Sequence, residues 1–303
     1  MRFRTLLVLV VGLLLGLGCD GSTKSGDDAG GGGGPDGGGG APDGGSTPGD
    51  WALLISGDWT LPAGDEGYVC VRKTVPETIY ITSFRPIIPN GTHHTVLTVG
   101  SPSGPDGTFA CGVGTNAASM IFGSGVGTNQ LDMPEGVGVK IEAGQQLNLN
   151  LHLYNFNESA PISGTSGTEV LTAPSVTHEA EVILGGPFAF EVTSTNTVIE
   201  GDCTMNGDVT IFATGPHMHQ LGRHMRVSAG GEMIMDRDYT FDEQTIDLIS
   251  PLSLTNGTQI HVACTYADPG AGVTVSYGDS TDAEMCFAGL YRYPVRGGFL
   301  CVN

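Results

Sequence analysis

Hydrophobic and polar residues alternate along most of this chain, which is the pattern of β-strands that bury one face. The clearest example is QLNLNLHLYNF, residues 146–156, where four leucines share one face and Asn148, Asn150, His152 and Tyr154 share the other. On this pattern His152 is expected outside the core. The segments DVTIFAT, QIHVACTY and VTVSY alternate in the same way.

The alternating segments are short and are separated by turn sequences. PNG, SPSGPDG, TNG and ADPGAG recur at short intervals, and helical periodicity is nearly absent. We therefore predict an all-β chain with two consecutive antiparallel β-sandwich domains of jelly-roll type. Pro174 interrupts two strand-like runs near the middle, so the predicted domains are residues 51–174 and 175–303.

The N-terminal sequence MRFRTLLVLVVGLLLGLGCDG is typical of an export signal, predicted over residues 1–18. A small residue directly before Cys19 resembles the bacterial lipoprotein processing site, and cleavage near Gly18 without lipidation is the alternative. Residues 19–50 are rich in glycine and aspartate and are expected to be a disordered tether. The expected protein is an exported bacterial lipoprotein, anchored by Cys19 to a membrane in the periplasm or at the cell surface.

Charge and cysteine content narrow the classes of partner and compartment. The formal net charge of -20 argues against nucleic acid and against anionic membrane surfaces as partners. Only the lipid anchor is therefore expected to contact a membrane. The protein is expected to be a monomer. Of the seven cysteines, six remain after Cys19, which suggests three disulfides in an oxidising compartment. Chain order favours Cys70 with Cys111; Cys203, Cys264, Cys286 and Cys301 would then pair among themselves.

Two histidine clusters could hold metal ions. In FATGPHMHQLGRHM, His217 and His219 would point to one face of a strand. His93 and His94, in PNGTHHTVL, could share a metal only where their strand is distorted or just beginning, and the preceding PNG turn allows this. Each cluster alone also fits a solvated polar segment.

Taken in order with the cysteines, these residues resemble the copper type II, ascorbate-dependent monooxygenases, the family of peptidylglycine α-hydroxylating monooxygenase and dopamine β-monooxygenase. HMHQLGR is similar to the family's HTHxLG segment, and DAEMC to its DEMC segment. The resemblance covers nearly all of residues 70–301. It implies one copper on His93, His94 and His152 and a second on His217, His219 and Met285. It also implies three disulfides: Cys70 with Cys111, Cys203 with Cys301, and Cys264 with Cys286.

The resemblance further implies how two copper ions would share the chemistry. The three-histidine copper would pass an electron, and His217, His219 and Met285 would form the catalytic site that activates dioxygen and hydroxylates a C–H bond of a small organic substrate. Ascorbate or another one-electron reductant would be the co-substrate. A thioether favours Cu(I), whereas zinc would fit the three histidines better than Met285.

Three departures from the peptide-amidating branch bear on the substrate. That branch holds a peptide carboxylate with an arginine, an asparagine and a tyrosine, where this chain has Gly215, Phe287 and Gly289. Peptide amidation is therefore not expected, and FAGLYRY, residues 287–293, is expected to be a core strand rather than a substrate clamp. Asn150 also replaces a glutamine of the family near the third histidine. The alternatives are a non-catalytic copper-binding lipoprotein for storage or delivery, and an adhesive β-sandwich.

Overall fold

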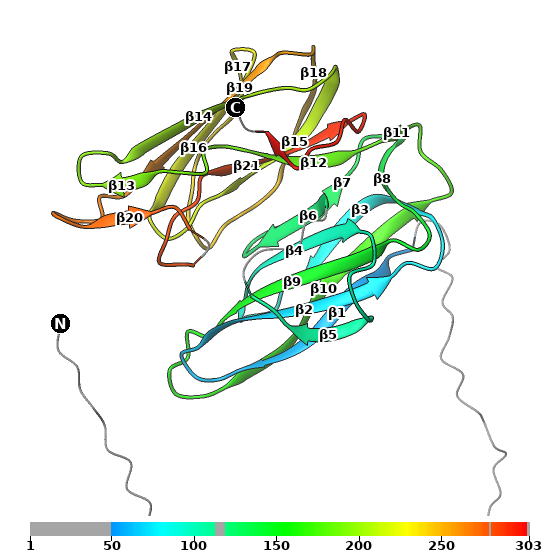
Figure 1. Ribbon diagram of the computed structural model, residues 1–303, viewed down its shortest axis with the longest axis horizontal. Coiled ribbons are helices and arrows are strands. Elements are labelled where there is room, and N and C mark those ends of the chain that lie inside the picture. The colour runs from blue at the N-terminus through cyan, green and yellow to red at the C-terminus, as the bar shows by residue number, and fades with distance from the viewer. Residues whose placement is uncertain (1–49, 113–118, 279, 302–303) are drawn as a thin grey trace, which may run out of the picture. The chain divides into compact units, whose positions relative to one another are not determined.

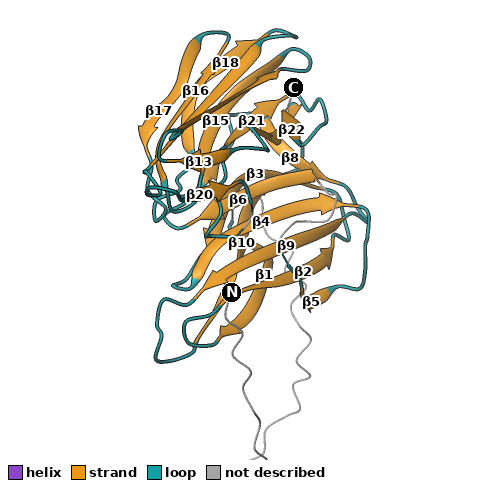
Figure 2. Cartoon of the chain, turned by 60° about the vertical axis from the view of Figure 1, so that its left-hand side comes forward, coloured by secondary structure: helices purple, strands orange, loops and turns teal. Residues whose placement is uncertain are grey.

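The computed structural model describes residues 50–112, 119–278 and 280–301, and all their regular elements are β-strands (Figures 1 and 2). This confirms the predicted all-β class. The expected signal peptide, Cys19 and all of the expected tether except Asp50 lie outside these residues. Within them, no helix has the length and apolar character needed to cross a membrane.

The first ten strands, with β11, form two sheets. One has the order β1 (Ala52–Leu61), β10 (Ile162–Ala173), β3 (Ile79–Ile87), β8 (Val137–Ile141) and β11 (His178–Glu179), and β7 (Leu131–Asp132) also pairs with β3. The other has the order β5 (Gly107–Ala110), β2 (Glu66–Thr74), β9 (Gln146–Tyr154), β4 (Thr92–Gly100) and β6 (Ser119–Gly125). Every pairing is antiparallel except that of β11 with β8.

The leucine face of β9 lies in the core, as its alternation predicts. Leu147, Leu149 and Leu151 are fully buried. The expectation for the opposite face is wrong: His152 is also fully buried, and Asn150 is 4% exposed. Alternation separates the two faces of a strand but does not tell whether the polar face meets water, and here protein covers both faces of β9.

The remaining strands form a second group (Figure 1). A five-stranded sheet has the order β18 (Asp247–Leu254), β15 (Val209–His217), β21 (Phe287–Tyr293), β12 (Glu181–Gly185) and β22 (Leu300–Cys301). A four-stranded sheet has the order β14 (Val198–Thr204), β19 (Gln259–Tyr266), β16 (Gly222–Ala229) and β17 (Glu232–Asp238). The short strands β13 (Glu191–Thr193) and β20 (Thr274–Ser276) pair with each other. The domain bounds given above stay a prediction.

Three disulfides join these strands. Cys70 on β2 is bonded to Cys111, just after β5. Cys203 on β14 is bonded to Cys301 on β22, and Cys264 on β19 to Cys286, directly before β21. These are the pairs that the resemblance implies.

Candidate metal centre

Three imidazoles from β4 and β9 converge on one point. Nδ1 of His93 lies 3.0 Å from Nδ1 of His152 and 3.0 Å from Nδ1 of His94, and the third side of this triangle is 3.3 Å. The centre of such a triangle is roughly 1.8 Å from each nitrogen, close to the roughly 2.0–2.1 Å of metal–imidazole bonds. The three donors therefore fit a single metal ion.

A β-bulge allows two neighbouring histidines to take part. In the pairing of β4 with β9, Thr92 lies opposite Leu153 and His94 lies opposite His152, so His93 is an extra residue in the ladder. A bulge changes the direction in which the following side chains point. The strand is thus both distorted and just beginning at this point. This meets the condition stated above for His93 and His94 to share a metal.

The second nitrogen of His152 has its own partner. Nε2 lies 2.5 Å from Oε1 of Glu66 on β2, and the ring of Tyr68 stacks on the imidazole with centroids 4.4 Å apart. Glu66 also accepts a hydrogen bond from Thr281 at 3.2 Å. A carboxylate on the far nitrogen fixes the tautomer of a metal-binding histidine and strengthens it as a donor.

Burial keeps these imidazoles neutral. It lowers the pKa of His93 to about 2, with further lowering by neighbouring His152 and His217. Burial also lowers the pKa of His94 well below its ordinary value. For His152 burial lowers the pKa although Glu66 opposes the shift. Neutral imidazoles present lone pairs to a metal at ordinary pH without first losing protons.

His217 and His219 straddle the end of β15. The strand ends at His217, so the expectation that both stand on one strand is wrong for His219, which lies in the following turn. Nδ1 of His217 is 2.9 Å from Oε1 of Gln244, and Nδ1 of His219 is 3.0 Å from the carbonyl oxygen of Ala283. Both Nδ1 atoms therefore act as donors, which leaves both Nε2 atoms with lone pairs. Burial lowers the pKa of His219 to about 3.

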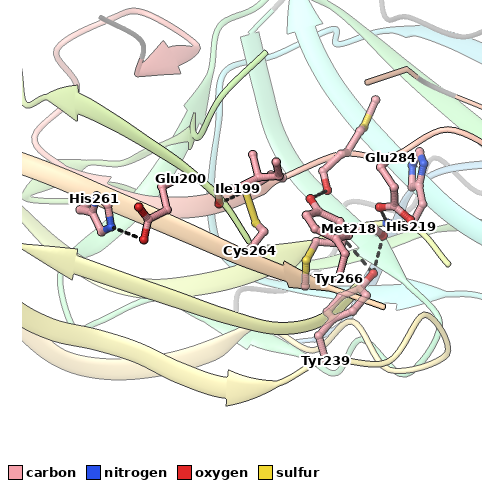
Figure 3. The surroundings of a disulfide bond; sticks show 11 residues. Ile199, Glu200, Met218, His219, Tyr239, His261, Cys264, Tyr266 and Glu284 are labelled. Atoms are coloured by element: carbon pink, nitrogen blue, oxygen red, sulfur yellow. Dashed lines mark hydrogen bonds and ion pairs between the residues drawn. A yellow bond between two sulfur atoms is a disulfide. The ribbon is translucent and has the colours of Figure 1, made fainter. Parts of the chain in front are cut away.

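Hydrogen bonds and the neighbouring disulfide hold the backbone around Met285. Figure 3 labels His219, Tyr266 and Glu284 among the residues that make these contacts. The Glu284 carboxylate accepts hydrogen bonds from the amides of His219 at 2.9 Å and Leu221 at 2.7 Å. The hydroxyl of Tyr266 donates to the carbonyl of Met285 at 2.8 Å, and Cys286 is locked in its disulfide. Burial raises the pKa of Glu284 to about 7, although backbone amides oppose the shift.

One cavity of about 470 Å³ reaches both histidine clusters. It is lined by His94 and by His217, His219 and Met285, and the rings of His94 and His217 lie edge to face with centroids 5.5 Å apart. The expectation that residues 287–293 only build the core needs correction. Phe287, Gly289 and Tyr291 also line this cavity, because alternate residues of β21 face it.

Several supporting residues were not singled out from the sequence. Glu66, Phe241 and Gln244 are far in sequence from the histidines that they contact, and Phe241 stacks on His93 with centroids 4.2 Å apart. No local sequence pattern predicts such contacts. Glu284 could have been noticed, since it directly precedes Met285.

Two sequence comparisons with known proteins point to one kind of relative. The family model described as copper type II ascorbate-dependent monooxygenase, C-terminal domain, matches residues 168–303. The human "Putative DBH-like monooxygenase protein 2" is 27% identical over 284 residues. The match covers 81% of this chain, and the chain spans 57% of that relative.

Two solved structures that match this chain are only distantly similar to it. Dimeric latent PorU from Porphyromonas gingivalis has a TM-score of 0.23 and 10% identity over 77% of this chain and 25% of its own. An anti-sigma factor domain-containing protein has a TM-score of 0.18 and 13% identity over 76% of this chain and 82% of its own. TM-scores this low do not define a shared fold.

Proposed function

Since this chain, by its match over residues 168–303, belongs to the family of copper type II ascorbate-dependent monooxygenases, we propose that it hydroxylates a C–H bond of a small organic molecule with dioxygen. One copper would bind to Nδ1 of His93, His94 and His152. The other would bind to Nε2 of His217, Nε2 of His219 and the sulfur of Met285. Bound copper would supply one-electron transfer and the reduction of dioxygen.

The reaction balances with an external reductant. A substrate R–H, one dioxygen molecule, two electrons and two protons yield R–OH and water. A C–H bond is replaced by a C–O bond, and the second oxygen atom leaves as water. A one-electron reductant such as ascorbate would supply the electrons in two steps, so the proposed partners are substrate, dioxygen and reductant.

The protein's own residues hold and orient the donors in this proposal. Glu66 and Tyr68 fix the ring of His152, while Gln244 and the carbonyl of Ala283 select the Nε2-donating tautomers of the other two rings. A substrate bound in the cavity would lie beside the donors that line it.

The observation that carries the proposal is that a soft thioether and three candidate imidazole ligands line one cavity. Thioether sulfur favours Cu(I), and a zinc site would be expected to use thiolate, carboxylate or a third histidine in its place. A storage or delivery protein for copper, the competing function, has no need of two unlike sites.

The test combines copper counting with oxygen uptake. Wild-type protein should bind two copper ions and consume dioxygen in the presence of ascorbate and substrate. Met285→Ile should keep the three-histidine copper and lose most turnover, and X-ray absorption of the reduced protein should lose its copper–sulfur component. Met120→Ile removes another sulfur from the same cavity and is the control. Two coppers with only nitrogen and oxygen neighbours in the reduced wild type would contradict the assignment.

We also propose that the protein acts outside the cytoplasm, tethered through a lipid on Cys19. The three disulfides support an oxidising compartment. The proposed active form is a monomer.

A further inference from the structure

The cavity that reaches the candidate ligands has no charged wall. None of the described residues that line it is a lysine, arginine, aspartate or glutamate. Its volume of about 470 Å³ falls within the roughly 300–1,000 Å³ of small-molecule pockets. In the metal-free protein, a carboxylate or ammonium group inside would lose its hydration without gaining an ion pair with a described side chain of the wall, which disfavours charged ligands.

Polar side chains in the wall are engaged with the protein itself. The hydroxyls of Thr95 and Ser124 are hydrogen-bonded to each other at 2.8 Å, and Thr128 donates to the carbonyl of Gln244 at 2.6 Å. Each such bond uses one hydroxyl hydrogen, so fewer donors remain for a polar substrate. These groups therefore do little to attract a polar ligand.

Aromatic rings build one side of the cavity. The ring centroids of Phe188 and Phe287 are 4.6 Å apart, and Tyr277 lies edge to face against Phe287 at 6.1 Å. Flat aromatic walls gain most from ring-shaped apolar ligands, which can stack or meet them edge to face.

Two glycines on neighbouring strands enlarge the cavity. Gly215 on β15 and Gly289 on β21 lie opposite each other in the ladder, and both line the cavity. Neither has a positive φ, so the backbone does not demand glycine at either position. A Cβ added at Gly289 would meet its nearest atom at 3.6 Å, so this position can accept a methyl group. The missing side chains leave space for ligand.

We infer that the substrate of the proposed monooxygenase is an uncharged, largely apolar molecule with an aromatic or alicyclic ring, and that Gly289 sets the room available to it. This inference rests on the proposed function, because the bound molecule is a substrate only if the protein is a monooxygenase. The binding itself needs no copper and is therefore testable separately.

Metal-free, full-length protein is the material for the binding test. The uncharged fluorophore N-phenyl-1-naphthylamine is titrated in, and three ligands of the same skeleton then compete with it: butylbenzene, 4-phenylbutyrate and 4-phenylbutylamine. Butylbenzene should displace the probe at least about tenfold more effectively than either charged analogue.

Variants place the binding in this cavity. Gly289→Leu should weaken binding of the probe at least about tenfold by filling the space, and Gly289→Ala, which fits sterically, should weaken it less. Gly112 is not among the described residues that line the cavity, and no described atom lies within 4 Å of a Cβ added there, so Gly112→Leu should leave binding unchanged. Thermal unfolding of each variant verifies folding, and Gly289→Ala remains informative if the leucine variant does not fold.

The inference is overturned by equal displacement with a charged analogue, by no binding of the probe, or by probe binding that neither Gly289 variant reduces. Failure of the proposed function looks different. It would appear as missing copper or missing oxygen uptake while neutral ligands still bind to the metal-free protein.

Discussion

The carboxylate of Glu66 contacts Nε2 of His152 at 2.5 Å, on the edge of the ring opposite the Nδ1 that faces His93 and His94. Glu66→Gln should therefore weaken copper binding at the three-histidine site by about 10- to 100-fold, because the ring loses its anionic partner. The reduction potential of that copper should rise, since a weaker donor stabilises Cu(II) less. Competition with a chelator and redox titration measure the two effects.

Thr281→Val is the matched control for this change. It removes the other hydrogen-bond donor to Glu66 and leaves the contact with His152 in place. We expect less than about a tenfold effect on affinity. An equal loss in both variants would mean that Glu66 acts by packing and not through the imidazole.

The metal-free protein should lose stability in acid because buried histidines resist protonation. The unfolded pKa of histidine is about 6.5, whereas the folded pKa of His93 is about 2. Between these values the unfolded state binds the proton, so stability is complete above about pH 6.5 and falls as the pH decreases. The contribution of one such histidine changes by about 1.4 kcal/mol per pH unit.

Urea unfolding of metal-free protein between pH 6 and pH 4 checks this slope. His93→Gln should make the slope shallower by about 1.4 kcal/mol per pH unit. His178→Gln changes an exposed histidine outside the cavity lining and should not. Equal slopes for wild type and His93→Gln would contradict the proposed effect of burial on the pKa of His93.

The sequence predicted the strands well and their surroundings poorly. Alternation identified β9 and its leucine face because a side-chain period of two is a local property. It misjudged His152, because what covers the second face depends on residues far away in the chain. The sequence indicated that His93 and His94 could share a metal if their strand were distorted. It could not predict the bulge itself, because a register shift depends on the partner strand.

For the candidate site, too, the local features could be predicted from the sequence and the contacts between distant segments could not. Ligand types and their order were readable because motifs such as HMHQLGR are local. The partners Glu66 and Gln244 were not, because each contact joins segments well separated in sequence. The role of Phe287 was misjudged because a strand can serve the core with one face and a cavity with the other.

The disulfide between Cys203 and Cys301 should stabilise the second group of strands. It closes a loop with a sequence separation of 98, which corresponds in the chain-entropy model to about 4.7 kcal/mol. The double variant Cys203→Ala, Cys301→Ala should lower the free energy of unfolding by an amount on the order of 4 kcal/mol. Denaturant unfolding measures the loss, and removing the shorter Cys264–Cys286 loop should cost less in the same model.

Cys19 should anchor the protein to a membrane. Cys19→Ser should release the protein in soluble form or leave it unprocessed, because the acceptor of the lipid is lost. Fractionation and mass spectrometry of the N-terminus test this. Wild-type protein that is wholly soluble and carries an unmodified N-terminus would contradict the prediction.

The Glu284 carboxylate should support the proposed copper site of His217, His219 and Met285 through its hydrogen bonds to the backbone. Glu284→Ala leaves the amides of His219 and Leu221 without their acceptor, which should destabilise the protein by about 2–3 kcal/mol. The turn that carries His219 should loosen, so copper should bind more weakly there while the three-histidine site keeps its copper. Glu243→Ala removes an exposed acid and is the control for charge. Copper titration, X-ray absorption and denaturant unfolding of both variants give the answer. Equal loss of copper from both sites, or none from either, would show that Glu284 does not specifically support the site of His217, His219 and Met285.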